Sequence, residues 1–189
     1  MTTSFTSTRL TPLTLSQASP QQQAELEQGQ RQVGFIPNMY ACMAHAPGLL
    51  ATYLQGYGAF RQHAGFTPAE QEVIFLAISQ ENQCDYCVAA HNMLAEKKSA
   101  VPAPTLQAIR SGQAITEPRL AALYAFARDM VQTRGRPCPR LGASFLEAGY
   151  SETQVLYLIL AIGVKTLSNF ANHYCQTPLD EVFAGFRLA

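Results

Sequence analysis

The chain has 189 residues, and its 13 basic and 13 acidic side chains give a formal net charge of zero. A neutral chain gives no electrostatic reason to expect a nucleic acid or an anionic membrane as its partner. Charged residues make up only 14% of the chain, well below the ~25% that is usual for soluble domains. This scarcity of charge predicts surface that is buried between subunits of a homo-oligomer, with a polar but uncharged surface as the alternative.

The N-terminus and the five cysteines indicate a cytoplasmic protein. Residues 1–9 lack the basic start and apolar run of a secretory signal. The longest apolar run, residues 155–164, is too short to span a bilayer and predicts a core helix. In a reducing cytosol five cysteines do not indicate a disulfide framework, which leaves metal binding, redox chemistry or core packing.

Helical patterns follow one another along the chain, and no segment combines strand alternation with hairpin turn signals. Residues 1–19 are rich in Ser and Thr and predict an extended N-terminal arm, whereas residues 20–189 predict a single all-α domain. Capping boxes at Thr67 and Ser151 predict two helix starts, and Asn82 is expected to cap the helix that follows it. The segments expected to be helical are 21–33, 37–44, 48–63, 67–81, 84–98, 102–111, 116–134, 139–148 and 151–173, with a last turn or two in 178–186.

One short motif carries the chemistry of the chain, Cys84-x-x-Cys87-x-x-x-His91. Composition alone would produce roughly 0.003 such motifs per chain, so chance does not explain it. On a helix that turns about 100° per residue, all three side chains fall on one face. If the helix starts near Cys84, both sulfurs lie in its first turn, where free N–H groups favour a thiolate.

An activated thiol needs a base, and that base needs a third group to orient it. His91 can take a proton from Cys87 or place positive charge beside it. The orienting group is expected to be a carboxylate on the preceding helix, where Glu70, Glu72 and Glu81 are the candidates. Glu72 lies in a strongly apolar run, so a buried Glu72 would need a partner such as His91. Glu70 is assigned to the capping box, and Glu81 is expected to be exposed.

The spacing Glu72-x11-Cys84-x-x-Cys87-x-x-x-His91 resembles the alkylhydroperoxidase D-like (AhpD-like) branch of the carboxymuconolactone decarboxylase superfamily, especially its peroxidase-related members. The segments Gly34-Phe-Ile-Pro-Asn38 and Asn169-Phe-Ala-Asn172 are similar to flanking family segments, so the resemblance covers roughly residues 33–185. It implies an all-helical, oligomeric enzyme that reduces hydroperoxides with two thiols.

Carried over by position, the resemblance gives Cys87 the role of the peroxide-attacking thiol and Cys84 that of the resolving thiol. His91 and Glu72 match the proton relay. Tyr86 stands where the family often has a second His, so the relay departs from the family pattern here. No flavin or nicotinamide fingerprint is present, so we expect no cofactor and no metal. Electrons then come from an external dithiol or a thiol protein.

Two alternatives remain from the sequence. One is lactone decarboxylation, the other activity of the superfamily, although that chemistry needs no dithiol. The other is a non-catalytic redox sensor or a zinc-binding helical oligomer, since Cys-x-x-Cys with a nearby His also resembles half a zinc site. The remaining candidates are interpreted as structural: cysteines 42, 138 and 175 as bystanders, His173 as a core residue, and Tyr53, Tyr57 and Phe60 as core or interface.

Overall fold

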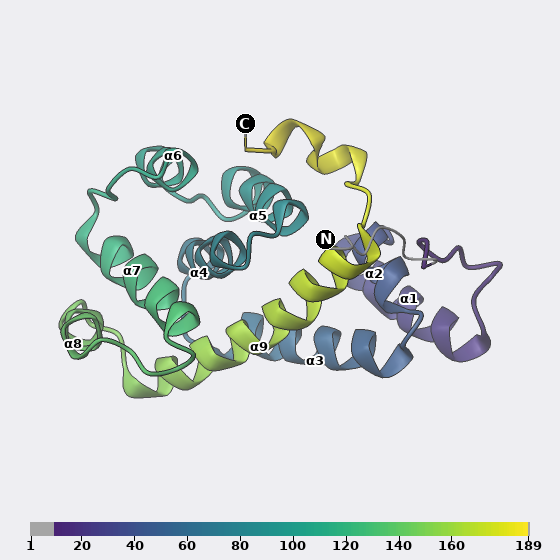
Figure 1. Ribbon diagram of the computed structural model, residues 1–189, viewed down its shortest axis with the longest axis horizontal. Helices are drawn as coiled ribbons and strands as arrows, with labels where there is room; N and C mark the ends of the chain where they lie inside the picture. The colour runs from purple at the N-terminus through teal and green to yellow at the C-terminus, as the bar shows by residue number, and fades with distance from the viewer. Residues whose placement is uncertain (1–9, 189) are drawn as a thin grey trace, which may run out of the picture.

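The computed structural model describes residues 10–188, and within that range the protein is helical with no strand, as predicted (Figure 1). The helices are α1 (Pro20–Val33), α2 (Asn38–Met43), α3 (Pro47–His63), α4 (Pro68–Glu81), α5 (Asp85–Lys97), α6 (Ala103–Ser111), α7 (Pro118–Gln132), α8 (Pro139–Glu147) and α9 (Glu152–Cys175), followed by the 3-10 helix η1 (Glu181–Phe186).

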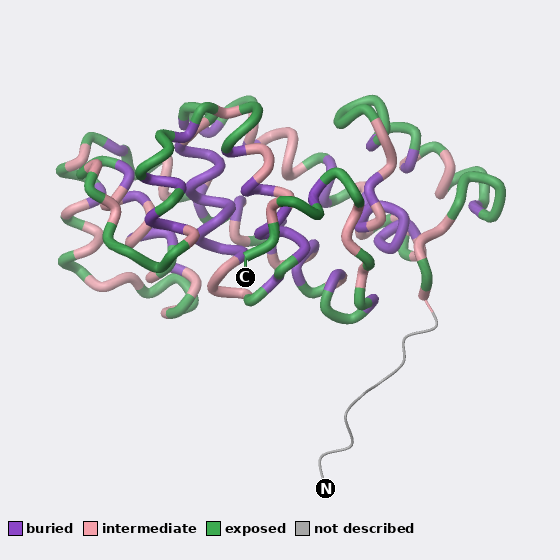
Figure 2. Tube along the Cα trace, turned by 90° about the horizontal axis from the view of Figure 1, so that it is seen from above, coloured by how far each residue is buried: buried purple, intermediate pink, exposed green. Residues whose placement is uncertain are grey.

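Helix α4 is the centre of the fold. It packs against α5, α7 and α9, and every residue from Glu70 to Ser79 is buried. The long helix α9 crosses the molecule next to α3 and reaches α2 at its far end, while η1 returns over α5 (Figure 1). Buried residues therefore run through the interior of the molecule, and exposed residues line the outer helices (Figure 2). Because α4 is enclosed on all sides, any charged side chain on it requires a partner inside the protein.

Local signals place most of the helix ends. Both predicted capping boxes form, at Thr67 and at Ser151. Gly34 ends α1 with a φ of 90°, a conformation that glycine adopts without strain. The prediction for Asn82 is wrong: it ends α4, and the N-cap of α5 is Cys84. The side chain of Asn82 instead donates to Asn169 Oδ1 at 2.9 Å, a contact between distant helices that local sequence does not reveal.

Helix α9 is longer than predicted and ends at Cys175. Among the described residues it is the one helix long and apolar enough to cross a membrane by length and composition. The apolar run counted from the sequence, residues 155–164, therefore underestimated the apolar length of this helix. A core helix of a soluble protein passes the same test, and a third of the apolar window is buried here. One side of α9 carries buried Lys165 and Asn172, while Leu156 and Phe170 on other parts of its surface are exposed.

Part of the predicted N-terminal arm can be followed. Residues 10–13 have no regular structure, a turn follows, and the Leu13 N–H donates to the Ala41 carbonyl of α2 at 3.2 Å. Ala18 is buried against the core. Residues 1–9 of the arm lie outside the described residues, as does Ala189. The described part of the arm thus lies against the body of the domain.

Candidate active site

The tight turn between α4 and α5 places both motif cysteines inside the protein. Gln83 adopts a positive φ of 55°, and the Cys84 N–H donates to the Ser79 carbonyl at 2.9 Å, so α5 starts directly after α4. Cys84 is the N-cap of α5 and Cys87 lies in its first turn. Both are free thiols, and they are only 1% and 2% exposed. The two sulfurs therefore lie at the positive end of a helix, away from bulk water.

Glu72, on α4, is fully enclosed and has two basic partners, His91 and Arg61. Its carboxylate accepts a hydrogen bond from His91 Nδ1 at 2.8 Å and forms an ion pair with Arg61 Nη2 at 2.6 Å. Burial alone would raise the pKa of Glu72, but the neighbouring His91 and Arg61 outweigh it and lower that pKa below its ordinary value. The structure thus brings together two of the predicted residues, Glu72 and His91, as an ionised carboxylate that orients an imidazole.

Lys165 is the site residue that sequence reasoning missed. It lies on α9, is wholly buried, and its Nζ is 3.0 Å from His91 Nε2. Since the ammonium group can only donate, Nε2 accepts and the His91 proton resides on Nδ1, facing Glu72. Burial lowers the pKa of His91 and the Lys165 charge lowers it further, so the imidazole is neutral. One feature of the sequence could have revealed it: Lys165 is the single cation within the apolar segment 155–172, and a buried cation needs a partner inside the protein.

Lys165 also changes the predicted proton route. His91 was expected to exchange a proton with Cys87 directly, but both of its ring nitrogens are occupied, by Glu72 and by Lys165. The charge of Lys165 instead acts on Cys87 and lowers its pKa. Glu72, His91 and Lys165 therefore form a hydrogen-bonded chain, and Lys165 lines the same cavity as Cys87.

The two thiols have opposite acidities. Burial alone would raise the pKa of Cys87, but a hydrogen bond from the Cys84 thiol and the charge of Lys165 lower it well below its ordinary value of 9.0. The pKa of Cys84 is raised, first by that same hydrogen bond and then by burial. Asn172 Nδ2, on α9, lies 3.3 Å from Cys87 Sγ and 3.6 Å from Cys84 Sγ. These pKa shifts favour the thiolate form of Cys87 and the protonated form of Cys84.

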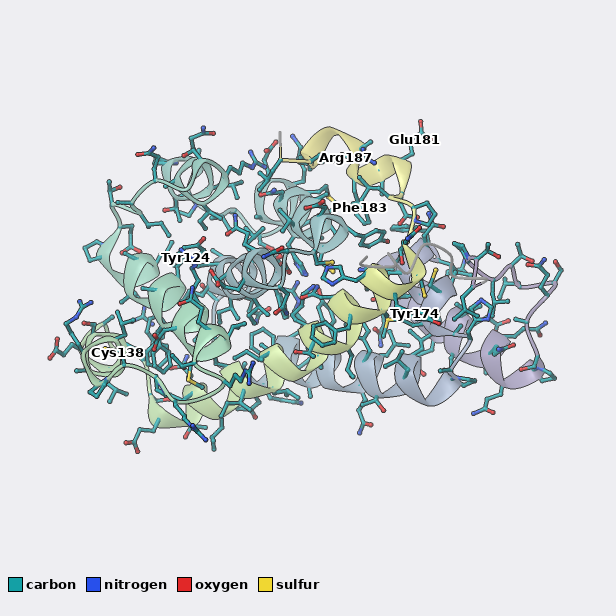
Figure 3. All side chains as sticks on the ribbon, in the orientation of Figure 1. Tyr124, Cys138, Tyr174, Glu181, Phe183 and Arg187 are labelled. Carbon is teal, nitrogen blue, oxygen red and sulfur yellow. The ribbon has the colours of Figure 1, made fainter. Side chains whose placement is uncertain are left out.

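Tyr86, which stands between the two cysteines, does not belong to this chain of proton donors. Its hydroxyl donates to the Asp180 carboxylate and accepts the Met39 N–H at 3.4 Å. Asp180 also accepts the Asn38 N–H at 3.2 Å, and the Tyr86 ring packs edge-on against Phe183. A tyrosine at this position therefore fastens the C-terminal segment onto α5, as the location of Phe183 over that helix illustrates (Figure 3).

A small cavity of about 160 Å³ leads to the sulfur of Cys87. His91 and Lys165 form its buried wall, and Val33 and Lys98 lie at its exposed edge. Its other walls are mostly aromatic and aliphatic: Phe35, Pro37, Met39, Tyr40, Tyr53, Tyr57, Tyr86, Ala90, Met93, Leu94 and Phe183. The tyrosine stripe on α3 is part of the core as expected, since Tyr53 and Phe60 are buried in it and Tyr57 packs against it, and Tyr53 and Tyr57 also line the cavity.

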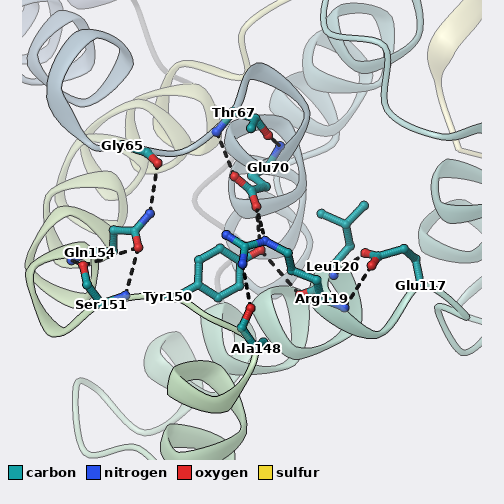
Figure 4. A network of polar contacts seen from close by, with 10 residues as sticks. All are labelled: Gly65, Thr67, Glu70, Glu117, Arg119, Leu120, Ala148, Tyr150, Ser151 and Gln154. Atoms are coloured by element: carbon teal, nitrogen blue, oxygen red, sulfur yellow. Dashed lines mark hydrogen bonds and ion pairs between the residues drawn. The ribbon is translucent and has the colours of Figure 1, made fainter.

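The other two candidate carboxylates do not reach His91. Glu70 accepts the Thr67 N–H in the capping box and also binds Arg119 Nε and the Tyr150 hydroxyl, each at 2.9 Å (Figure 4). Glu81 accepts hydrogen bonds from Arg128 and Gln132 of α7. Both carboxylates therefore join α7 to α4, and neither belongs to the site.

The remaining predicted bystanders lie outside the site. His173 is exposed and its Nε2 contacts the Gln83 carbonyl at 3.1 Å, so its interpretation as a core residue is wrong. Cys42 and Cys175 are buried where α2 meets α9, and burial raises the pKa of both thiols. Cys138 is half-buried in the connection before α8 (Figure 3). Within residues 10–188, no cluster of three His, Cys, Asp or Glu side chains has the arrangement of a metal site.

The model of the carboxymuconolactone decarboxylase family matches residues 47–129, which span α3 to α7 and include Glu72, Cys84, Cys87 and His91. The matched segment is less than half of the chain, so the similarity to this family extends over α3 to α7. Lys165 and Asn172 lie beyond the matched segment. No match was found among curated proteins.

Solved structures share the AhpD-like fold over almost the whole chain. An uncharacterized peroxidase-related protein from Ralstonia eutropha JMP134, described as an alkylhydroperoxidase AhpD core, has a TM-score of 0.75 and 22% identity over 94% of this chain and 96% of its own. An uncharacterized peroxidase-related protein from Silicibacter sp. TM1040 has a TM-score of 0.74 and 19% identity over 96% of this chain and 98% of its own. A cysteine-to-alanine variant of the debrominase Bmp8, in complex with 2,3,4-tribromopyrrole, has a TM-score of 0.79 and 18% identity, covering 96% of each chain.

Proposed function

We propose that this AhpD-like protein is a thiol-dependent peroxidase that reduces hydroperoxides with Cys84 and Cys87. The observation that carries the proposal is that Cys87 and Lys165 line the same cavity, where the charge of Lys165 favours the thiolate form of Cys87. A thiolate is the nucleophilic form of cysteine, and a cation beside it can neutralise charge that develops on a leaving oxygen. Such a pair is suited to breaking an O–O bond.

In the first half-reaction, the Cys87 thiolate attacks the terminal oxygen of the hydroperoxide. An S–O bond forms, the O–O bond breaks, and the leaving alkoxide takes a proton from Lys165 to become an alcohol. Cys87 is oxidised to a sulfenic acid while the peroxide is reduced. The hydrogen bond to His91 Nε2 fixes the ammonium group in position, and Glu72 fixes His91 in turn.

In the second half-reaction, the Cys84 sulfur attacks the sulfenic sulfur. A disulfide forms, and the sulfenic hydroxide leaves as water with the proton of the Cys84 thiol. An external dithiol, either a small molecule or a thiol protein, then reduces the disulfide by exchange and is itself oxidised. One proton returns to Lys165 as Cys87 regains its thiolate form. The net reaction converts a hydroperoxide and a dithiol into an alcohol, water and a disulfide.

The deciding experiment is a thiol titration before and after one equivalent of cumene hydroperoxide. Loss of two thiols, located by peptide mass spectrometry as a link between Cys84 and Cys87, is the expected result. Cys87→Ser should abolish peroxide consumption in a dithiol-coupled assay, whereas the matched variant Cys138→Ser should retain it. Unchanged turnover in Cys87→Ser would refute the proposal. Lactone turnover without peroxide consumption would favour the decarboxylase alternative instead.

Reductive dehalogenation is a second candidate, favoured by the aromatic walls of the cavity. At about 160 Å³ the cavity is close in size to an engineered cavity of about 150 Å³ that binds benzene. The debrominase Bmp8, in its complex with 2,3,4-tribromopyrrole, shares the fold. Here the thiolate would take a halogen from the ring, the ring carbon would gain a proton, and Cys84 would displace halide to give the same disulfide. Bromide release from tribromopyrrole with a dithiol present, in the absence of peroxide turnover, would make this the principal activity.

A further inference from the structure

Asn172 lies between the two reacting sulfurs. It is on α9, 5% exposed, and its side-chain nitrogen is 3.3 Å from Cys87 Sγ and 3.6 Å from Cys84 Sγ. Sulfur hydrogen bonds are longer than those to oxygen, so one amide group contacts both atoms. Among the described residues, Asn172 is the one side chain outside α5 that hydrogen bonds to both sulfurs.

The direction of this contact is informative. The amide nitrogen can only donate, so it stabilises an anionic sulfur and offers less to a neutral thiol. The amide oxygen, Asn172 Oδ1, is buried and has no hydrogen-bond partner among the described residues. A flipped amide would place an acceptor against the thiolate and repel it. The orientation therefore agrees with an anionic Cys87 and a protonated Cys84.

A second asparagine on the same helix shows that this arrangement is not a general property of α9. Asn169 is also buried, one turn before Asn172, but its Oδ1 accepts the Asn82 side chain at 2.9 Å and joins α9 to the end of α4. Asn169 thus has a contact between helices and Asn172 has a contact with reacting atoms. The pair offers a matched comparison within a single helix.

We infer that Asn172 is a catalytic residue whose amide stabilises the Cys87 thiolate and holds Cys84 in position to attack the sulfenic acid. The inference rests on the proposed thiol chemistry, because it assigns Asn172 to both half-reactions. In the first, the amide N–H groups favour the charged nucleophile. In the second, the same group keeps the resolving thiol beside the oxidised sulfur, so the disulfide forms before a second peroxide can react.

The first test measures the acidity of Cys87 without any peroxide. Alkylation of the protein by iodoacetamide as a function of pH, followed on the Cys87 peptide by mass spectrometry, gives its titration midpoint. Asn172→Leu removes the donor, and we expect the midpoint to rise by about one pH unit, which is about tenfold less thiolate at any pH below both midpoints. Asn172→Asp places a carboxylate there and should raise the midpoint further. Asn169→Asp, the matched control, should leave it unchanged.

Other groups facing Cys87 are held constant across these variants. They are Cys84 and His91 on α5, Lys165 on α9, and the phenols of Tyr40, Tyr53, Tyr57 and Tyr86. The pKa values of these phenols are raised, first of all by burial, so they remain neutral over the range tested.

The second test follows the fate of oxidised Cys87. After one equivalent of cumene hydroperoxide, a dimedone-type reagent should trap several-fold more sulfenic acid in Asn172→Leu than in the wild type or in Asn169→Asp. A Cys87 midpoint in Asn172→Asp equal to the wild-type value would overturn the inference, as would equal shifts in the variants at 172 and 169. Failure of the peroxidase proposal is distinguishable, because the alkylation midpoint does not depend on turnover.

Discussion

Replacing Lys165 with Met tests whether a buried cation sets the reactivity of the site. Met has a similar volume, so the change removes the charge and keeps the packing. The ammonium group is 3.0 Å from His91 Nε2, and its charge and hydrogen bonding lower the pKa of Cys87. A hydrogen bond to a charged group contributes about 1.5–3 kcal/mol, and about 1.4 kcal/mol corresponds to one pKa unit. The pKa of Cys87 should therefore rise by about one to two units in Lys165→Met.

The assay is the pH dependence of peroxide reduction under single turnover. At pH values below the wild-type midpoint we expect roughly 10- to 100-fold slower oxidation of Cys87, with much of the loss recovered as pH rises through the midpoint of the variant and the thiolate forms. Full recovery is not expected, because Lys165 also protonates the leaving alkoxide. The control is Lys98→Met at the exposed edge of the cavity, which should behave like the wild type.

Stability separates this effect from misfolding. Exchanging a buried charged group for an apolar residue of similar volume is often neutral or stabilising. Lys165→Met should therefore melt at or above the wild-type temperature while it loses activity. An unshifted pH profile, or a loss of activity that parallels a loss of folded protein, would refute the reasoning.

Three further predictions use the same structure. Glu72→Gln should destabilise the protein by about 3 kcal/mol at neutral pH, since it breaks a buried ion pair with Arg61. Because the pKa of Glu72 is lowered by folding, this difference should be present above the ordinary value of 4.5 and disappear as pH falls through the folded value, which urea unfolding across pH can measure. Burial raises the pKa of Cys42 to about 11, so its peptide should resist iodoacetamide below that pH. Sedimentation should find an oligomer that Leu156→Glu and Phe170→Glu dissociate, and a monomeric wild type would contradict this.

The helices were predictable because their signals are local. The capping residues Thr67 and Ser151 act on N–H groups three residues away, so sequence spacing alone identifies them. The pair formed by Glu72 and His91 was predictable for a similar reason, since consecutive antiparallel helices bring an apolar run and a short motif together. Asn82 was misassigned because it lies between the end of α4 and the start of α5, so local sequence allows it to cap either helix. Its hydrogen bond to Asn169 of α9 is a long-range contact that local sequence does not reveal.

The contributions of α9 were not predictable in this way. Lys165 is 74 positions from His91, and Asn172 is 85 positions from Cys87. Their contacts depend on how α9 lies across α4 and α5, which no local pattern encodes. The cavity was missed for the same reason: Tyr53 and Tyr57 have the spacing of an ordinary core stripe, and only the placement of α5 opposite them leaves a space between the helices.

Lys165 and Asn172 are seven residues apart, which is close to two turns of helix and aligns both side chains toward α5. A chain that keeps the full Cys-x-x-Cys-x-x-x-His motif is therefore expected to have a less reactive thiol if its last long helix lacks this pair. Among chains that share the motif, we expect those with Lys-x6-Asn in this helix to have a reactive thiol and those without it to have an unreactive one. Reading the final helix together with the motif would sort such sequences before any protein is made.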